Sequence, residues 1–124
     1  MQTAITSTRT FQPAPLPARA TDAELVERAA SGDQVAFERI MRKNNRLLFR
    51  TARSILKSDA EAEDALQEAY LRAWRALSMF RADSKLSTWL ARIVINEALG
   101  RVRRRSAQVI ALESVMESTD RQTQ

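Results

Sequence analysis

Residues 58–77 read SDAEAEDALQEAYLRAWRAL and carry the clearest structural signal in this chain of 124 residues. Ser58 and Glu61 have the spacing of a capping box, in which each side chain accepts a hydrogen bond from the backbone N–H of the other residue. The apolar positions that follow recur at steps of three and four, as one face of a helix requires. They are Ala62, Ala65, Leu66, Ala69, Ala73 and Leu77. The stretch therefore predicts an amphipathic helix that begins near Ser58.

Two helices are expected before this stretch. Thr21 and Glu24 form a second capping-box pattern, and Gly32 is expected to end the helix that they begin. Asp33 can cap the next helix. The apolar positions of that helix, again at steps of three and four, are Phe37, Ile40, Met41, Leu48, Ala52, Ile55 and Leu56.

A last helix is expected from about Thr88 to Arg105, after a loop near residues 78–87. The side chains expected to face inward from it are Trp89, Leu90, Ile93 and Leu99. The sequence shows neither period-2 alternation nor turn dipeptides, which are the signals of strands and hairpins. The expected fold is therefore all-α, a compact bundle of three or four helices.

The two ends of the chain differ from the part between them. Residues 1–21 contain all three prolines and no helical or strand period, so a flexible, disordered tail is expected there. Residues 106–124 are polar after Leu112 and are expected to form a second tail or the start of a linker. The domain is thus expected to span residues 22–105.

Composition excludes most kinds of enzyme site. The chain has no cysteine, so it has no disulfide framework and a cytoplasmic protein is expected. Without cysteine and histidine, zinc and haem lose their usual ligands and the commonest general base is missing, so no metal or cofactor is expected. The two glycines, Gly32 and Gly100, form no phosphate-binding loop. The apolar runs are too short to span a membrane.

Charge is unevenly distributed around the net value of +5. Residues 72–105 hold nine basic and two acidic residues, whereas residues 22–71 hold eight basic and ten acidic ones. A basic region favours phosphate and an acidic one favours a protein partner. Within residues 34–57 a basic stripe also recurs at helical steps, which we interpret as an ordinary solvated face. Its members are Arg39, Lys43, Arg46, Arg50, Arg53 and Lys57.

Residues 59–68 contain five carboxylates, and several of them stabilise the first turn of a helix through its dipole. The dipole does not account for Glu68. It also leaves unexplained the residues that recur at steps of three and four on one face expected to be exposed, Asp64, Gln67, Leu71 and Arg75. A solvated face and a protein-docking face are both open interpretations at this point.

Residues 79–89 combine an aromatic residue near each end with cations and small hydroxyl side chains, a set that can hold an unstacked base. Trp89 suits the core better than a stacking surface. Downstream, one helical face carries Lys85, Thr88, Arg92, Asn96 and Arg103. Asparagine is a poor helix-interior residue, so Asn96 calls for a hydrogen-bond partner, and its amide suits a base edge.

Three strings in the chain resemble the region 2 domain of bacterial RNA polymerase sigma factors, most closely the extracytoplasmic-function (ECF) type. They are DAELVERAASGDQVAF at residues 22–37, DALQEAYLRAWRAL at residues 64–77 and FRADSKLSTWLARIVIN at residues 80–96. Their order and spacing also resemble those of the family, and together they cover residues 22–105. Such sigma factors continue into a second helical domain, region 4, whereas this chain stops where the interdomain linker would still be running.

The resemblance implies a role for each face. The helix of residues 64–77 would dock on the coiled coil of the β′ clamp of core RNA polymerase through Asp64, Gln67, Glu68, Leu71 and Arg75. The following loop would capture a flipped base of the promoter −10 element, on the non-template strand. The residues implied in it are Phe80, Arg81, Asp83, Ser84, Lys85, Leu86, Thr88 and Trp89. The last helix would read and hold the same element through Arg92, Asn96, Arg101, Arg103, Arg104 and Arg105.

The sequence therefore predicts a non-enzymatic transcription initiation domain that binds core polymerase and melted promoter DNA, and the resemblance implies an anti-sigma factor that covers the same faces. Two alternatives remain. A basic helical regulator that binds duplex DNA without polymerase would not depend on Asp64 or Glu68. A helical adaptor without a nucleic-acid role would not depend on Arg92 or Asn96.

Overall fold

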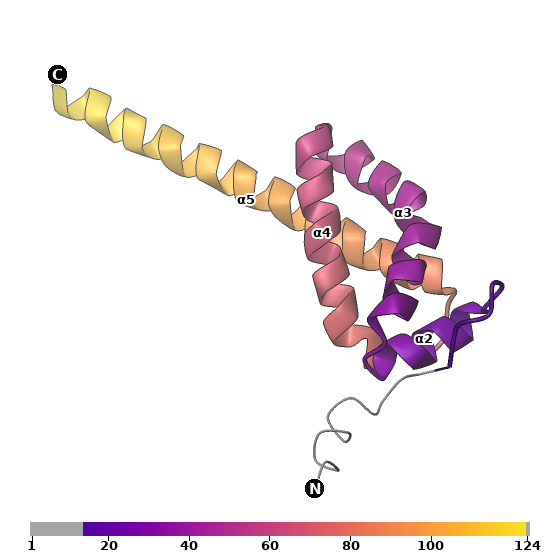
Figure 1. Cartoon of the computed structure of the whole chain (residues 1–124). Coiled ribbons are helices and arrows are strands. Elements are labelled where there is room, and N and C mark those ends of the chain that lie inside the picture. Colours follow the sequence, from indigo (N-terminus) through magenta and orange to yellow (C-terminus); the bar gives the residue numbers. More distant parts are fainter. Residues whose placement is uncertain (1–13, 124) are drawn as a thin grey trace, which may run out of the picture.

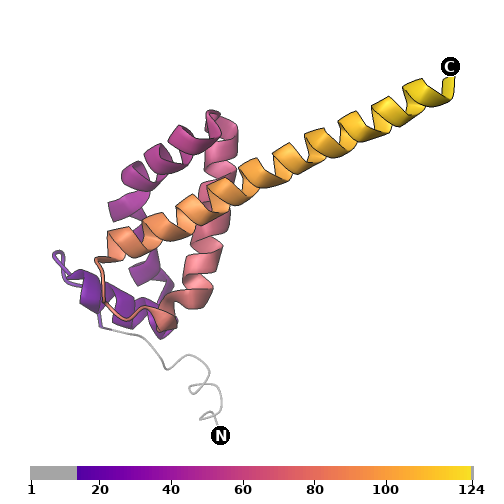
Figure 2. The same cartoon turned by 180° about the vertical axis from the view of Figure 1, so that it is seen from behind.

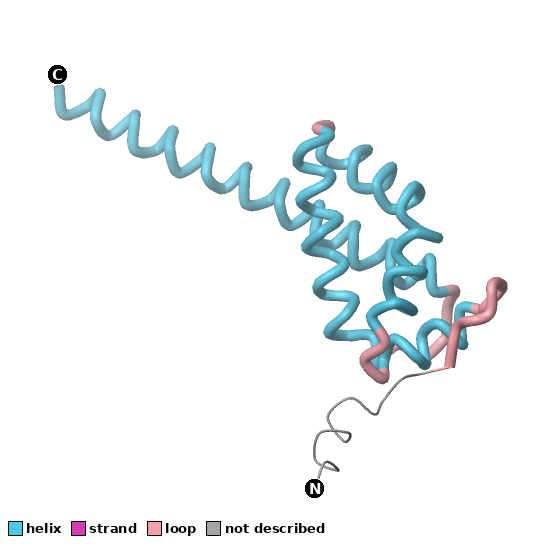
Figure 3. Tube along the Cα trace, in the orientation of Figure 1, coloured by secondary structure: helices cyan, strands magenta, loops and turns pink. Residues whose placement is uncertain are grey.

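The computed structural model describes residues 14–123, which form four α-helices and one short 3-10 helix (Figure 1). The elements are α2 (Asp22–Ala30), α3 (Gln34–Leu56), α4 (Asp59–Ala76), η1 (Leu77–Met79) and α5 (Leu86–Thr123). Within these residues there is no strand (Figure 3). The predicted all-α bundle is confirmed.

Local capping starts the first three helices where the sequence predicted. Thr21 and Glu24 form the full reciprocal capping box of α2. Asp33 caps α3 by accepting hydrogen bonds from the N–H groups of Val35 and Ala36. Ser58 caps α4 by accepting a hydrogen bond from the N–H of Glu61. Each cap satisfies a backbone donor that has no partner within its helix.

Helices α3, α4 and α5 pack against one another, and α2 lies against α3 and η1 at one end of the bundle (Figures 1 and 2). The largest fully buried side chains come from α2, α3, η1 and α5, and burying each one contributes about 1.5–3 kcal/mol. They are Leu25, Ile40, Leu48, Leu77, Leu90 and Val94. The small buried residues of α4, such as Ala62, Ala65 and Ala69, let the neighbouring helices approach closely.

The inward face of α5 differs from the one predicted. Its buried apolar residues are Leu86, Leu90, Val94 and Ala98, which follow one another at steps of four. The prediction for Leu99 was wrong, because Leu99 is 39% exposed. Leu99 follows Ala98 by one residue, which is about 100° around the helix, so the two side chains leave α5 in different directions.

Helix α5 is also longer than predicted. It continues past Arg105 to Thr123, so the expected end of the helix was wrong. Figures 1 and 2 show this part projecting away from the other helices, and residues 103–121 are all exposed. Residues 106–123 contain no proline or glycine and include the strong helix formers Ala, Leu, Glu, Met and Arg, which favour continuation of the helix without tertiary support.

The N-terminal tail was predicted for residues 1–21, of which residues 1–13 lie outside the described part of the chain. Residues 14–21 contact the helices. Leu16 packs against the core, and Ala20 is buried. The carbonyl of Pro17 accepts a hydrogen bond from Arg39 at 2.6 Å, and the carbonyl of Ala14 accepts one from Arg28. The packed part of the chain therefore begins before Asp22, earlier than expected.

Candidate functional site

The outward face of α4 carries the side chains that the sequence singled out. Asp64, Gln67, Leu71 and Arg75 are all exposed, and Leu71 is 50% exposed although it is apolar. Glu68 lies on the same face, with its carboxylate 4.0 Å from the guanidinium of Arg72. That contact is long and open to water, so it leaves the Glu68 carboxylate available to a partner. The five residues thus form one continuous surface, which we call the α4 face.

An open groove of about 560 Å³ lies beside the α4 face, between α3 and α4. Gln67 and Leu71 belong to both surfaces. The other lining residues come from the two helices and are mostly apolar or aromatic: Gln34, Phe37, Glu38, Met41, Tyr70 and Trp74. The sequence placed Phe37 and Met41 on an apolar helical face, but it did not predict a groove, because the groove forms only where α3 and α4 pair.

Aromatic side chains that contact one another line the bottom of the groove. The ring of Phe37 lies 5.1 Å from that of Trp74 and 6.4 Å from that of Tyr70, centroid to centroid, both in edge-to-face geometry. The Tyr70 hydroxyl donates a hydrogen bond to the side-chain oxygen of Asn45 at 2.9 Å. Burial raises the pKa of Tyr70 to about 12, so the phenol stays neutral at physiological pH.

The loop between η1 and α5 is anchored at both ends by aromatic rings. Phe80 and Trp89 lie 5.3 Å apart, centroid to centroid, and both pack against the core. The interpretation of Trp89 as a core residue is therefore confirmed. Between them Arg81, Asp83 and Lys85 are exposed. Ala82 has a φ of 61°, a left-handed conformation that costs free energy for any residue with a side chain.

A second hollow, of about 440 Å³, lies between this loop and α2. Phe80, Arg81 and Ala82 line one side of it. Helix α2 supplies the other side with Ala23, Glu24, Val26 and Glu27. The sequence did not connect α2 to the loop, because this contact depends on how the chain returns from α4 to the end of the bundle where α2 lies.

One side of α5 presents polar groups to solvent. Arg92, Asn96 and Arg103 are exposed, and their side chains have no hydrogen bond or ion pair with the part of the chain that the structure describes. The partner expected for Asn96 is therefore absent from residues 14–123, which leaves its amide available to a ligand. We call these three residues, which share one side of the helix, the α5 face.

The arginine block at residues 101–105 divides between two sides of α5. Arg101 and Arg104 reach the carboxylate of Glu97, with nitrogen–oxygen distances of 2.9 and 3.7 Å, and Arg72 of α4 reaches it at 3.1 Å. Arg105 pairs with Glu61 of α4. Arg101, Arg104 and Arg105 surround a polar recess beside Glu61, away from the α5 face. Sequence reasoning grouped these arginines with Arg103 and overlooked Glu97.

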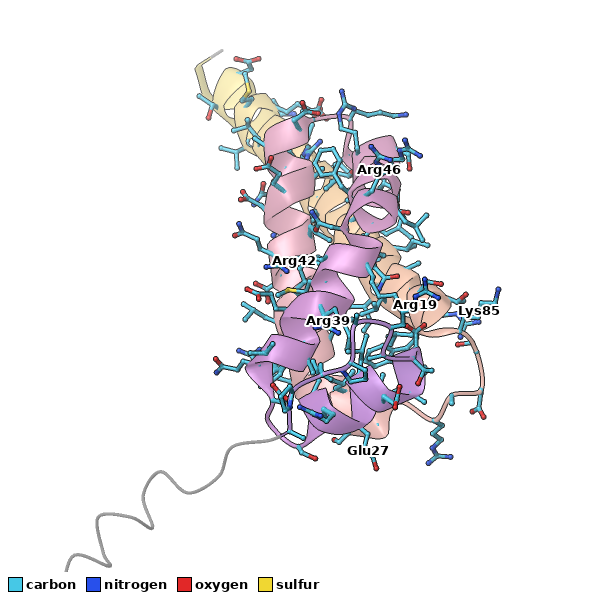
Figure 4. All side chains as sticks on the ribbon, turned by 45° about the vertical axis from the view of Figure 1, so that its right-hand side comes forward. Arg19, Glu27, Arg39, Arg42, Arg46 and Lys85 are labelled. Carbon is cyan, nitrogen blue, oxygen red and sulfur yellow. The ribbon has the colours of Figure 1, made fainter. Side chains whose placement is uncertain are left out.

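The basic stripe of α3 points away from the core, as its members Arg39 and Arg46 show in Figure 4 beside Arg42, which does not belong to the stripe. Some of its cations have partners among the described residues. Lys43 pairs with Asp22 at 2.6 Å and Arg53 with Asp59 at 2.7 Å, and Arg39 donates to the carbonyl of Pro17. These pairs agree with the interpretation of the stripe as a solvated face.

None of the helices in residues 14–123 has the length and apolar character needed to cross a membrane.

Comparison with known proteins identifies one family and several similar proteins from it. Residues 40–108 match the family described as Sigma-70 region 2. The chain is 43% identical over 105 residues to the ECF RNA polymerase sigma factor SigM of Mycobacterium tuberculosis, covering 84% of this chain and 54% of SigM. It is 42% identical over 79 residues to the ECF RNA polymerase sigma-E factor of Escherichia coli K12, covering 63% of this chain and 40% of that protein. The chain thus spans about half the length, or less, of these relatives.

Two solved structures resemble this fold. One is the complex of an engineered region 2 of sigmaE with GTAAAA, with a TM-score of 0.67 and 32% identity, covering 75% of this chain and 97% of that one. The other is CnrH in complex with the cytosolic domain of CnrY, with a TM-score of 0.56 and 30% identity, covering 70% of this chain and 60% of that one.

Proposed function

Because the chain belongs to the Sigma-70 region 2 family, we propose that it docks on core RNA polymerase and binds the melted −10 element of promoters. The observation that carries this proposal is the presence of two separate exposed surfaces, the α4 face and the α5 face, on helices that cross in the bundle. A domain of this kind can hold polymerase with one helix and DNA with another, and it acts by binding, without covalent chemistry.

The α4 face suits a protein partner. Asp64 and Glu68 offer charge, and the neighbouring groove offers an apolar floor into which a side chain of the partner can insert. Burying such a side chain contributes far more than an exposed ion pair. We therefore assign the docking of the β′ clamp coiled coil to Asp64, Gln67, Glu68, Leu71 and Arg75, and we extend the interface across the groove to α3.

The α5 face and the loop suit an unpaired DNA strand. The amide of Asn96 can bond a base edge, and Arg92 and Arg103 can contact phosphates. In the loop, Arg81 lines the hollow of about 440 Å³ and Lys85 is exposed, so the loop has both charge and space for an extruded base. Capturing a flipped base on the non-template strand stabilises the melted promoter. The solved complex of a related region 2 with GTAAAA supports DNA binding by a domain of this fold.

The other loop residues expected from the family resemblance fit this assignment to different degrees. Asp83 and Thr88 are exposed and Ser84 is partly exposed. The hydroxyls of Ser84 and Thr88 can donate to a base or a phosphate, and the Asp83 carboxylate can accept from a base amino group. Leu86 is buried and Trp89 packs against the core, so we assign these two the role of fixing the loop. Arg101 and Arg104 contact Glu97 within α5, and Arg105 pairs with Glu61 of α4, so we do not include these three among the direct contacts.

We further propose that an anti-sigma factor covers these faces when the protein is inactive, since the related CnrH was solved with the cytosolic domain of CnrY. A protein that needs both polymerase and promoter DNA works where these are found, in the bacterial cytoplasm.

Fluorescence anisotropy with labelled oligonucleotides tests the DNA part of the proposal. We expect tighter binding to a single strand containing GTAAAA, the sequence bound by the related region 2, or to one of its single-base variants, than to the corresponding duplex. Tight binding to duplex and weak binding to every single strand would contradict the proposal and favour the polymerase-independent regulator. The chain's own preferred bases follow from the variant series.

A further inference from the structure

We propose that Glu97 determines how selectively α5 binds DNA, because its buried carboxylate holds Arg101 and Arg104 away from phosphates. This inference rests on the proposed function of the α5 face. It concerns a residue that contacts no DNA itself and acts by positioning two cations that would otherwise bind any polyanion.

The geometry around Glu97 is that of a built ion cluster. The Glu97 side chain is only 3% exposed, although its neighbour Asn96 faces solvent. One carboxylate oxygen lies 3.1 Å from a guanidinium nitrogen of Arg72 on α4. The other oxygen accepts a hydrogen bond from Nε of Arg101 at 2.9 Å and lies 3.7 Å from Arg104. Both oxygens are thus engaged, by cations from two helices.

A buried carboxylate needs such partners, because taking an ion out of water is costly unless it is paired. This desolvation cost favours the conformation in which Arg101 stays beside Glu97. If Arg101 turned away to bind a phosphate, Glu97 would lose its hydrogen-bonded partner inside the protein, so Arg101 is held more firmly than an arginine in an exposed pair. Its side chain is accordingly only 27% exposed.

Arg101 and Arg104, which contact Glu97, lie at other angles around α5 than Arg103, which has no partner among the described residues. Arg103 follows Asn96 by seven residues, close to two full turns, and therefore lies on the same side of α5. Arg101 follows Asn96 by five residues, about 140° around the helix from it, and Arg104 follows by eight residues, about 80° from it. Arg104 is the more exposed of the two, at 63% against 27%. Arg103 has no ion pair with residues 14–123, whereas Arg101 and Arg104 share Glu97. Glu97 thus leaves phosphate binding to a few cations beside the base-reading amide of Asn96.

The effect of Glu97 on phosphate contacts can be measured from how DNA affinity depends on salt concentration. Each phosphate contact on a single strand adds about 0.7 to the slope of log K against log salt concentration. Phosphate contacts add affinity for every sequence equally, so releasing two arginines increases general affinity and lowers the ratio between the preferred and a scrambled strand. Glu97 is therefore expected to reduce total affinity and raise discrimination.

The experiment compares the wild-type protein with Glu97→Gln, Glu97→Asp, Arg101→Gln and Arg103→Gln. Circular dichroism first establishes that each variant keeps its helicity. Retention on immobilised heparin then reports affinity for a polyanion without bases, and anisotropy across a salt series reports binding to the preferred and scrambled single strands. Arg101→Gln and Arg103→Gln remove the same charge two residues apart, so they form a matched pair.

We expect Glu97→Gln to elute from heparin at higher salt, to steepen the salt slope by about 0.7 for each arginine released, and to bind the scrambled strand more tightly. Glu97→Asp, which keeps the charge, is expected to restore most of the wild-type behaviour. Arg103→Gln is expected to lower the slope by about 0.7, and Arg101→Gln by less than half of that. Equal effects of Arg101→Gln and Arg103→Gln would overturn the inference, even if Glu97→Gln failed to fold.

The heparin and oligonucleotide measurements distinguish a failure of this inference from a failure of the proposed function. If no protein prefers any single strand over duplex, the proposed function fails. The heparin arm still decides whether Glu97 holds the arginines, because heparin carries no sequence. Unchanged heparin retention in a folded Glu97→Gln variant would overturn the role of Glu97, whatever the oligonucleotides show.

Discussion

At the scale of single residues, Asn96 and Glu97 are neighbours in the sequence with opposite surroundings. Asn96 could be predicted as a binding residue, because an exposed amide inside a helix has no local explanation. Glu97 could not be predicted in the same way. Its importance comes from Arg72, which lies 25 positions earlier in the sequence and reaches it only when α4 and α5 cross. A pattern of charges along one helix does not contain that contact.

Replacing Asn96 with alanine tests the reading of base edges. We expect Asn96→Ala to weaken binding of the preferred single strand by about 1–3 kcal/mol, because a base edge loses its hydrogen-bonding partner. Asn96 is exposed and bonds no described residue, so the helicity of the variant should equal that of the wild type. Fluorescence anisotropy with single-base variants of the strand measures the loss.

The control for this variant is Asn45→Ala, which removes the same group from α3, where it contacts Tyr70 and lies away from the α5 face. It is expected to leave DNA affinity unchanged. Equal affinity of Asn96→Ala and the wild type for every strand would exclude Asn96 from the set of base-reading residues.

At the scale of helices, the sequence predicted the beginnings better than the ends. The caps at Thr21, Asp33 and Ser58 depend on neighbours within three residues, so their signal is local and complete. The inward face of α5 was harder to predict, because the run Ile93-Val94-Ile95 allows several apolar faces. Only packing against α3 and α4 selects the one that contains Val94.

The cap of α3 makes stability depend on pH. Partial burial raises the pKa of Asp33, but hydrogen bonds from the N–H groups of Ala36 and Val35 and from Arg28 outweigh this and hold it below the ordinary value of 3.8. A lowered pKa in the folded state stabilises the protein above the ordinary pKa, and the effect is lost as the pH falls through the lowered value.

We therefore expect the thermal midpoint of the wild type to fall between about pH 5 and pH 2, and to fall less in Asp33→Asn, which keeps a capping oxygen but does not titrate. Thermal melts followed by circular dichroism at several pH values measure this. An identical decrease in both proteins would show that Asp33 does not contribute to the pH dependence.

At the scale of the whole molecule, the projecting part of α5 does not pack against the helical bundle. The bundle was predictable from helical periods, whereas the groove between α3 and α4 was not, since Phe37 and Trp74 meet only through tertiary pairing. The far part of α5 exposes several apolar side chains that no described residue covers: Val109, Ile110, Leu112, Val115 and Met116.

Removing this part of α5 tests that separation. We expect a chain ending at Arg105 to have an unfolding free energy within about 0.5 kcal/mol of that of the full chain, because residues 106–121 are exposed and none of them belongs to the core. Urea denaturation followed by circular dichroism measures it. A loss of more than about 1 kcal/mol would show that residues beyond Arg105 support the bundle.

The proposed function depends on docking of the α4 face on polymerase, and retention of core RNA polymerase by the immobilised protein tests this docking. The comparison uses the wild type, Glu68→Lys, and Glu113→Lys, which makes the same charge change on the exposed far part of α5. We predict retention by the wild type and Glu113→Lys and loss of retention by Glu68→Lys, with unchanged helicity in all three. Equal retention by Glu68→Lys and the wild type would contradict the account.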